Sequence, residues 1–150
     1  MEKNKKIAFV YFSTNKTQNT FKLLQKMKEV RDIDLIEVSQ AKDEDLAKYD
    51  IVGFASGIYA WKFSKKIINF IASSTLNNLN VVIVSTSGGK ATKPHNKIKE
   101  IIKAKQWNLL SEFNTIAVDK FGPFGWIGGL NKNRPNEQEI QQSKDWIKSL

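Results

Sequence analysis

The chain has 150 residues, a length that suits one domain with its own core, and we expect a single domain over 1–150. It contains no cysteine, which excludes disulfides, thiolate metal ligands and a cysteine nucleophile. The formal net charge of +9 fits either a well-solvated lysine surface or an anionic partner. No apolar run reaches the ~20 residues of a membrane span, and the run after the charged start is too short for a signal peptide. We therefore expect a cytoplasmic protein.

Strand-like apolar runs and helix-like periodicities alternate along the sequence. We expect strands over 6–12, 33–39, 50–56, 80–87 and 113–119. Helical patterns follow over 20–30, 63–74, 95–105 and from about Pro135 onward, with a short helix or turn over 43–49. This alternation predicts an α/β fold with a five-stranded parallel sheet and helices on both faces. In such a sheet, ligands bind at the carboxyl ends of the strands.

The loop after the first expected strand is rich in small polar side chains. Hydroxyls, amides and one lysine follow each other there: Ser13, Thr14, Asn15, Lys16, Thr17, Gln18, Asn19 and Thr20. A strand, a polar loop and a helix N-terminus together form an anion site, which suits a phosphate monoester. The alternative is ordinary N-capping within a polar turn. The loop matches neither a Walker motif nor a dinucleotide-binding glycine motif.

Three further segments occur in order along the chain: YDIVGFASGIYAWKFSKKIINFI, VVIVSTSGG and FGPFGWIGGLNKNRPNEQEI. They resemble segments of the flavodoxin family. The resemblance implies a flavodoxin-like three-layer sandwich, with strand order 2-1-3-4-5 in its parallel sheet. It also implies FMN bound non-covalently at the strand ends.

The resemblance also implies roles for particular residues. The segment from Ser13 to Thr20 lies where the family binds the FMN phosphate. The flavin ring is expected between two further groups, namely Gly57, Ile58, Tyr59, Ala60 and Trp61 on one side, and Thr86, Ser87, Gly88 and Gly89 on the other. Tyr59 and Trp61 suit stacking on the ring, the alternative being packing against the sheet edge. Gln18 stands where the family's first loop has glycine, and Lys16 adds a positive charge there.

Few other residues carry a chemical signal. His95 is the only histidine, and we expect it to be a surface residue at a helix start, with proton donation to a flavin-bound substrate as the alternative. Neither metal-ligand spacing nor a Ser-His-Asp arrangement is suggested. Trp107, Trp126 and Trp146 are expected to pack. Lysines near the three loops should favour the negatively charged reduced flavin and so raise its potential: Lys16, Lys62, Lys65, Lys66, Lys90 and Lys93.

The sequence thus predicts an FMN-binding redox protein, either an electron carrier or a small flavin-dependent reductase. It would work with a redox partner protein, for which the basic charge favours an acidic surface. One alternative is an activator of a partner enzyme such as ribonucleotide reductase, because the opening VYFSTNKTQNT also resembles the flavodoxin-like protein that serves that enzyme. A binding domain that has lost the flavin is a further alternative. Nucleic-acid binding ranks last, since the lysines are spread along the chain without a recognisable motif.

Overall fold

The structure is a computed structural model that describes residues 5–12, 19–59, 62–86, 95–114 and 137–150. Its strands are β1 (Ile7–Phe12), β2 (Ile33–Glu37), β3 (Ile51–Tyr59), β4 (Lys62–Phe63), β5 (Asn80–Thr86) and β6 (Asn108–Asn114). Its α-helices are α1 (Asn19–Lys28), α2 (Asp43–Leu46), α3 (Lys65–Ser73), α4 (Asn96–Ala104) and α7 (Glu137–Lys148). A short 3-10 turn, η2 (Val38–Gln40), follows β2.

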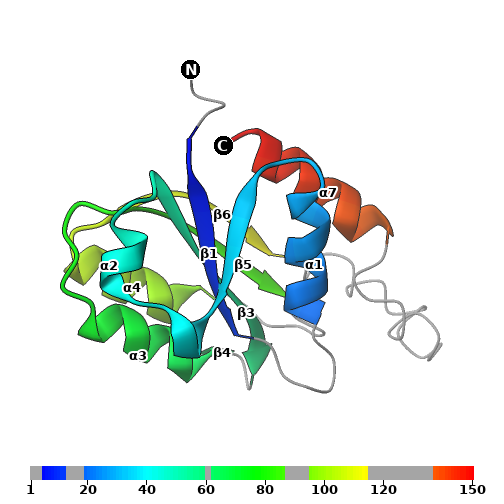
Figure 1. The fold of residues 1–150 in the computed structure, drawn as a ribbon. Helices are drawn as coiled ribbons and strands as arrows, with labels where there is room; N and C mark the ends of the chain where they lie inside the picture. Colours follow the sequence, from blue (N-terminus) through cyan, green and yellow to red (C-terminus); the bar gives the residue numbers. More distant parts are fainter. Residues whose placement is uncertain (1–4, 13–18, 60–61, 87–94, 115–136) are drawn as a thin grey trace.

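Five strands run parallel in the order β2-β1-β3-β5-β6, and β4 pairs antiparallel with the end of β3. Counted without β4, this is the predicted order 2-1-3-4-5, so the predicted fold is confirmed. Figure 1 shows the sheet between two helical layers, with α1 and α7 on one face and α2, α3 and α4 on the other. The consecutive crossovers place β1, β3 and β5 side by side in the middle.

Each face of the sheet has its own apolar core. Alternate strand residues point to opposite faces, so neighbours in one strand contribute to different clusters. Phe9 and Ile7 pack with Leu23, Leu24 and Met27 of α1 and with α7. The other face joins strand residues to apolar side chains of α3 and α4, among them Val10, Phe54, Ile67, Ile71, Ile98 and Ile102. Burial on both faces explains why β1 and β5 read as nearly continuous apolar runs.

The helices cover the sheet because their apolar residues recur at helical spacing. In α3 and α4 the buried pairs Ile67/Ile71 and Ile98/Ile102 are four residues apart and share one helix face. Ser64 caps α3, since its hydroxyl accepts a hydrogen bond from the backbone N–H of Lys66.

The tryptophans that the structure describes pack as predicted. Trp107 is buried and stacks on Phe54, with ring centroids 6.2 Å apart. Trp146 packs against Phe113 at 5.7 Å and donates a hydrogen bond from its indole N–H to Ser111. Trp126 lies outside the described residues.

One strand was placed wrongly by the sequence. The fifth parallel strand begins at Asn108, not at Phe113, and residues 115–119 lie outside the described part. Along β6 the side chains alternate between exposed and half-buried, because this strand has a parallel neighbour on one side only. Its polar positions hid it from a search for apolar runs. The two-residue strand β4 was also missed, and β3 continues to Tyr59, beyond the predicted end at Ser56.

No helix in the described part of the chain is long and apolar enough to cross a membrane.

Gly53 provides a test of the central packing. It pairs with Phe9 in the β1–β3 register, and a Cβ at Gly53 would lie 2.2 Å from Cε2 of the Phe9 ring. We expect Gly53→Ala to lower the free energy of unfolding by about 1–3 kcal/mol, because the ring is held on all sides and cannot move away. Urea unfolding measures the change. In a chain that carries Phe9→Leu, Gly53→Ala should lower the free energy of unfolding by less than it does in the original chain. An equal loss in both chains would contradict the contact.

Candidate functional site

The carboxyl edge of the sheet brings together the three segments singled out in the sequence. The strands β1, β3 and β5 are adjacent and parallel, so the connections that leave them start side by side. Gly57 pairs with Thr86 in the β3–β5 register. Thr20, at the second position of α1, meets Thr86 directly. Each of the three predicted groups therefore has a member at this edge, namely Thr20, Gly57 and Thr86.

A buried hydroxyl pair joins the first segment to the third. The Oγ atoms of Thr20 and Thr86 lie 2.9 Å apart, and the two residues are only 1% and 9% exposed. Each hydroxyl satisfies the other, and the pair fixes the start of α1 against the end of β5. The first turn of α1 has no acidic residue, so its free amides and helix dipole keep a positive potential there.

A polar row crosses the sheet one position before this edge. Ser56 pairs with Ser85, and Ser85 pairs with Asn114, across β3, β5 and β6. All three face the α3/α4 side, whereas Thr86 faces α1. Ser56 accepts a hydrogen bond from the backbone N–H of Ser64, and its own hydroxyl donates to the carbonyl of Gly57. The apolar core of this face thus ends in a hydrogen-bonded polar layer.

His95 contradicts the prediction of a surface helix-start residue. It immediately precedes α4, but it is only 5% exposed and its side chain makes no cap hydrogen bond to the helix. Instead the ring turns toward the sheet, where Phe63 packs edge-on against it with centroids 5.9 Å apart. The reason lies in partners that are distant in sequence. Nε2 lies 2.6 Å from the Oγ of Ser85, and Nδ1 lies 2.7 Å from a carboxylate oxygen of Glu112.

We call Ser85, His95 and Glu112 the His95 relay. The acceptor-only carboxylate of Glu112 requires Nδ1 to carry the hydrogen, so in the neutral ring Nε2 accepts from the Ser85 hydroxyl. Asn114 donates a further hydrogen bond to the Ser85 Oγ. The second carboxylate oxygen of Glu112 accepts from Lys99 at 3.1 Å. The relay therefore links β5, α4 and β6 through satisfied polar groups.

Burial and neighbouring charges act in opposite directions on the pKa values of His95 and Glu112. Burial lowers the pKa of His95 below 6.5, Glu112 partly offsets this, and Lys99 adds to the lowering. A cation at the N-terminus of a helix is also disfavoured by the helix dipole. For Glu112, burial would raise the pKa, but the hydrogen bonds from His95 and Lys99 outweigh burial, and the pKa is lowered. At neutral pH the relay thus holds a neutral ring beside a carboxylate.

The connectivity is that of a nucleophilic Ser-His-acid triad, an arrangement that the sequence did not suggest. Ser85, however, is completely buried, and its Oγ already accepts from Asn114 and contacts His95. A substrate carbonyl cannot reach such an oxygen, so the geometry excludes acyl transfer by Ser85. His95 is therefore a buried acid–base group, bonded to the strand residue that precedes Thr86 at the carboxyl edge.

A lysine also lies at this edge. The Nζ of Lys66 sits 5.6 Å from the ring centroid of Phe12, the last residue of β1. Lys65 and Lys66 are exposed at the start of α3, so they place positive charge near the strand ends.

Several predicted site residues fall outside the described part of the chain. These are Ser13, Thr14, Asn15, Lys16, Thr17, Gln18, Ala60, Trp61, Ser87, Gly88 and Gly89. Asn19, Ile58 and Tyr59 are described by their backbone only, in α1 and at the end of β3. Their roles, including stacking by Tyr59 or Trp61, stay predictions.

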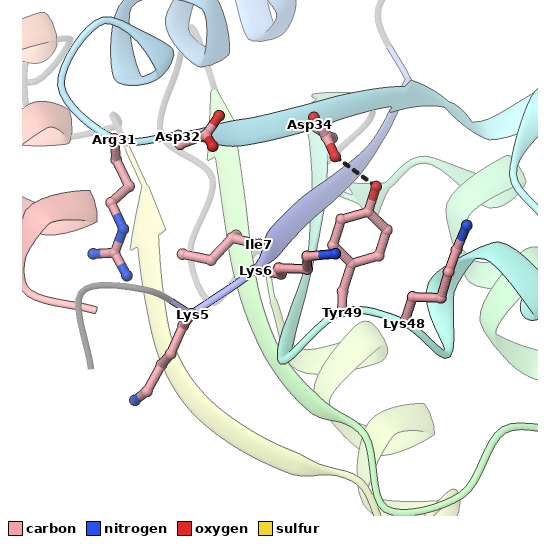
Figure 2. A pocket seen from close by; sticks show the side chains of 8 residues that line it. All are labelled: Lys5, Lys6, Ile7, Arg31, Asp32, Asp34, Lys48 and Tyr49. Atoms are coloured by element: carbon pink, nitrogen blue, oxygen red, sulfur yellow. Dashed lines mark hydrogen bonds between the residues drawn. The ribbon is translucent and has the colours of Figure 1, made fainter. Parts of the chain in front are cut away.

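A separate pocket of about 420 Å³ lies at the opposite, amino edge of the sheet. Figure 2 shows its lining, which comes from the starts of β1 and β2 and the turn before β3: Lys5, Lys6, Ile7, Arg31, Asp32, Asp34, Lys48 and Tyr49. The Tyr49 hydroxyl donates to Asp34 at 2.6 Å, and this bond chiefly raises the pKa of Tyr49 to about 12. None of the predicted flavin-site residues lines this pocket. In the described residues, no group of three or more His, Asp or Glu side chains is placed to hold a metal ion.

The sequence matches a family model described as a flavodoxin domain over residues 9–131. The chain belongs to the flavodoxin family. A protein of Methanocaldococcus jannaschii, described as uncharacterized, is 30% identical over 145 residues, covering 95% of this chain and 97% of that protein.

Solved flavodoxin structures share the fold. A flavodoxin from the domain Archaea superposes with a TM-score of 0.68 at 14% identity, covering 95% of this chain and 93% of the other. The two-electron reduced flavodoxin of Megasphaera elsdenii gives a TM-score of 0.66 at 10% identity, covering 95% and 98%. At these identities the likeness concerns the fold.

Flavodoxins bind FMN, and the described carboxyl edge fits this cofactor. The phosphate needs hydrogen-bond donors and positive potential, which the N-terminus of α1 provides, held in place by the Thr20–Thr86 pair. The ring needs space bounded by backbone near the ends of β3 and β5, where Gly57 and Thr86 are paired.

The buried state of His95 predicts a pH dependence of stability. Because the folded pKa lies below the unfolded value of 6.5, the unfolded chain binds a proton that the folded chain does not. We expect the free energy of unfolding to be full above about pH 7 and to fall as pH drops through the folded pKa. Urea unfolding of the flavin-free chain at several pH values measures this.

His95→Gln, which cannot titrate, should flatten that dependence between about pH 7 and 5. Lys103→Gln, on the same helix but exposed, is the control and should keep it. A His95→Gln curve as steep as that of the original chain would show that His95 does not carry the effect.

Proposed function

We propose that the chain is an FMN-dependent redox protein that exchanges electrons with a partner protein at the carboxyl edge of its sheet. The observation that carries this proposal is that Thr20, Gly57 and Thr86, one residue from each predicted segment, meet at one edge of the sheet. A bound flavin supplies the electron transfer, and the protein supplies position and electrostatics. A cytoplasmic location stays a prediction.

The residues at this edge have distinct parts in the proposal. The backbone N–H groups at the N-terminus of α1 hold the phosphate, and the Thr20–Thr86 hydrogen bond fixes this N-terminus against β5. The backbone of Gly57 and Thr86 forms the floor on which the ring rests. Lys65 and Lys66 supply positive charge beside the strand ends. The same charge favours a partner with an acidic surface, in keeping with the net charge of +9.

Flavin binding is tested by the absorption spectrum of the purified full chain, with and without added FMN. We expect the yellow colour and flavin bands, with FMN released on heating. A colourless protein that takes up no FMN would overturn the proposal and leave a flavodoxin fold without its cofactor.

Thr20 should contribute to FMN affinity by fixing the start of α1 against β5. We expect Thr20→Val to weaken FMN binding by about 2–10-fold, because it removes the Thr20–Thr86 hydrogen bond, and a neutral hydrogen bond is worth about 0.5–1.5 kcal/mol. Quenching of flavin fluorescence measures the Kd. Thr75→Val is the matched control, since Thr75 bonds to Asp43 in the connection that enters β5 at its opposite end. An unchanged Kd for Thr20→Val would mean that the phosphate binds elsewhere.

Lys66 should raise the potential of bound FMN. We expect Lys66→Met to lower the two-electron potential by about 10–20 mV, equivalent to about 0.5–1 kcal/mol for an exposed charge. A redox titration at low ionic strength measures the shift, which added salt should reduce. Lys48→Met at the amino edge is the control, and an equal shift in both variants would argue against a local effect.

A further inference from the structure

The His95 relay is a buried acid–base device that electron transfer alone does not require. Its distances, 2.6 Å from Ser85 to Nε2 and 2.7 Å from Nδ1 to Glu112, form a continuous chain of hydrogen bonds between β5 and β6. A structural role at this position needs a packed side chain that bonds to the buried Ser85 hydroxyl, which an amide that does not titrate could supply. A titratable ring that is 5% exposed needs a different explanation.

The relay adjoins the candidate cofactor edge through the backbone of β5. Ser85 directly precedes Thr86, whose hydroxyl meets Thr20 at the start of α1. Ser85 and Thr86 point to opposite faces of the sheet, so the relay lies beneath the edge on the α4 side. A charge that develops at the edge is therefore felt by His95 through buried protein, where screening by solvent is weak.

The charges around the ring oppose one another, so a charge that develops at the carboxyl edge can shift the pKa of His95. Glu112 on β6 favours the imidazolium, whereas burial and Lys99 on α4 disfavour it. The β4 side presents the neutral ring of Phe63, and β5 presents the neutral Ser85. On α3, the Nζ of Lys66 lies over Phe12. Among the described residues, one carboxylate and one ammonium, which bond to each other, thus act on the pKa of the ring in opposite directions.

We propose that the His95 relay is a redox-linked proton store, in which His95 takes up a proton when the flavin at the carboxyl edge is reduced. The inference rests on the proposed function. Glu112 keeps the hydrogen on Nδ1, so Nε2 is the atom that gains the proton. The Ser85 hydroxyl then stops donating to Nε2 and accepts from the new Nε2–H.

The balance of electrons and protons is as follows. Two electrons from a reductant such as dithionite, with one proton, convert bound FMN to its singly protonated reduced form. That form carries one more negative charge on the ring than the oxidised form. His95 takes a second proton from solvent and offsets this charge. Reduction then consumes two electrons and two protons where His95 is neutral beforehand.

The size of the coupling follows from electrostatics. A unit charge about 10 Å from an ionisable group shifts its pKa by about one unit at an effective dielectric constant of about 20. We therefore expect reduction to raise the pKa of His95 by about one unit. Between the two pKa values, the potential should fall with pH about twice as steeply as in a variant lacking the ring.

The single histidine makes the test direct. In the tag-free full chain, NMR of the imidazole carbons and nitrogens reports one residue without assignment by mutation. The titration is recorded for the flavin-free chain, the FMN-loaded oxidised chain and the chain reduced with dithionite. We expect the Nδ1–H tautomer in the neutral ring and a pKa about one unit higher after reduction.

The outcomes separate the two proposals. Bound FMN with an unchanged His95 pKa on reduction, or a neutral ring with hydrogen on Nε2, would overturn the relay and leave the FMN assignment standing. A chain without flavin bands would overturn the proposed function and the relay together. A raised pKa with the Nδ1–H tautomer would support both.

Two variants distinguish proton storage from mere packing. Glu112→Gln should lower the pKa of His95 in both redox states, because it removes the one carboxylate that favours the imidazolium. Glu100→Gln, an exposed site on α4, is the matched control and should leave it unchanged. Lys99→Met, at a half-exposed position that tolerates change, should raise it. Equal titration curves in Glu112→Gln and Glu100→Gln would contradict the relay.

Discussion

The fold and its site depend on the close parallel pairing of β1, β3 and β5. The ring of Phe9 covers Gly53 so tightly that no Cβ fits beneath it. This contact sits in the middle of a sheet that is buried on both faces, where the strands have no freedom to slide without exposing apolar side chains. The carboxyl ends of the three strands are therefore fixed relative to one another before any ligand arrives. Binding of a cofactor at that edge therefore loses little free energy in ordering the three strand ends.

Strand β5 changes from apolar to polar residues within one position at this edge. Along β5, the apolar run Val81 to Val84 gives way to Ser85 and Thr86, which serve opposite faces. Thr86 pairs with α1, and Ser85 pairs with His95 and Asn114, so neither buried hydroxyl is left without a partner. Satisfied polar groups in a low-dielectric setting hold each other in fixed orientations. The edge thereby acquires a defined electrostatic character from side chains that belong to the core.

The parts of the fold that the sequence could predict are those with a local signal. Buried strands read as apolar runs and covering helices read as pairs four residues apart, so the order of elements followed. The strand order 2-1-3-4-5 came from the resemblance to the flavodoxin family. The prediction of β6 was wrong because its alternating pattern comes from its position at the edge of the sheet, which the local sequence does not reveal. His95 failed for a similar reason, since its partner Glu112 lies seventeen residues further along and is brought near only by the β5–β6 pairing. For the site, the sequence predicted three segments, of which Thr20, Gly57 and Thr86 are seen to meet. It offered His95 only as an alternative proton donor and gave no sign of its partners Ser85 and Glu112.

This acid–base group bears on the choice between an electron carrier and a reductase. A carrier that passes single electrons between proteins has no need for a stored proton, whereas reduction of a small organic acceptor by two electrons consumes protons as well. The relay keeps a neutral imidazole in a buried place, where Ser85 and Glu112 satisfy both ring nitrogens. An apolar side chain there would leave the Ser85 hydroxyl without its acceptor, whereas an amide would supply an acceptor but could not change its charge. A change of charge at His95 on flavin reduction would therefore distinguish the two functions, both of which the fold permits.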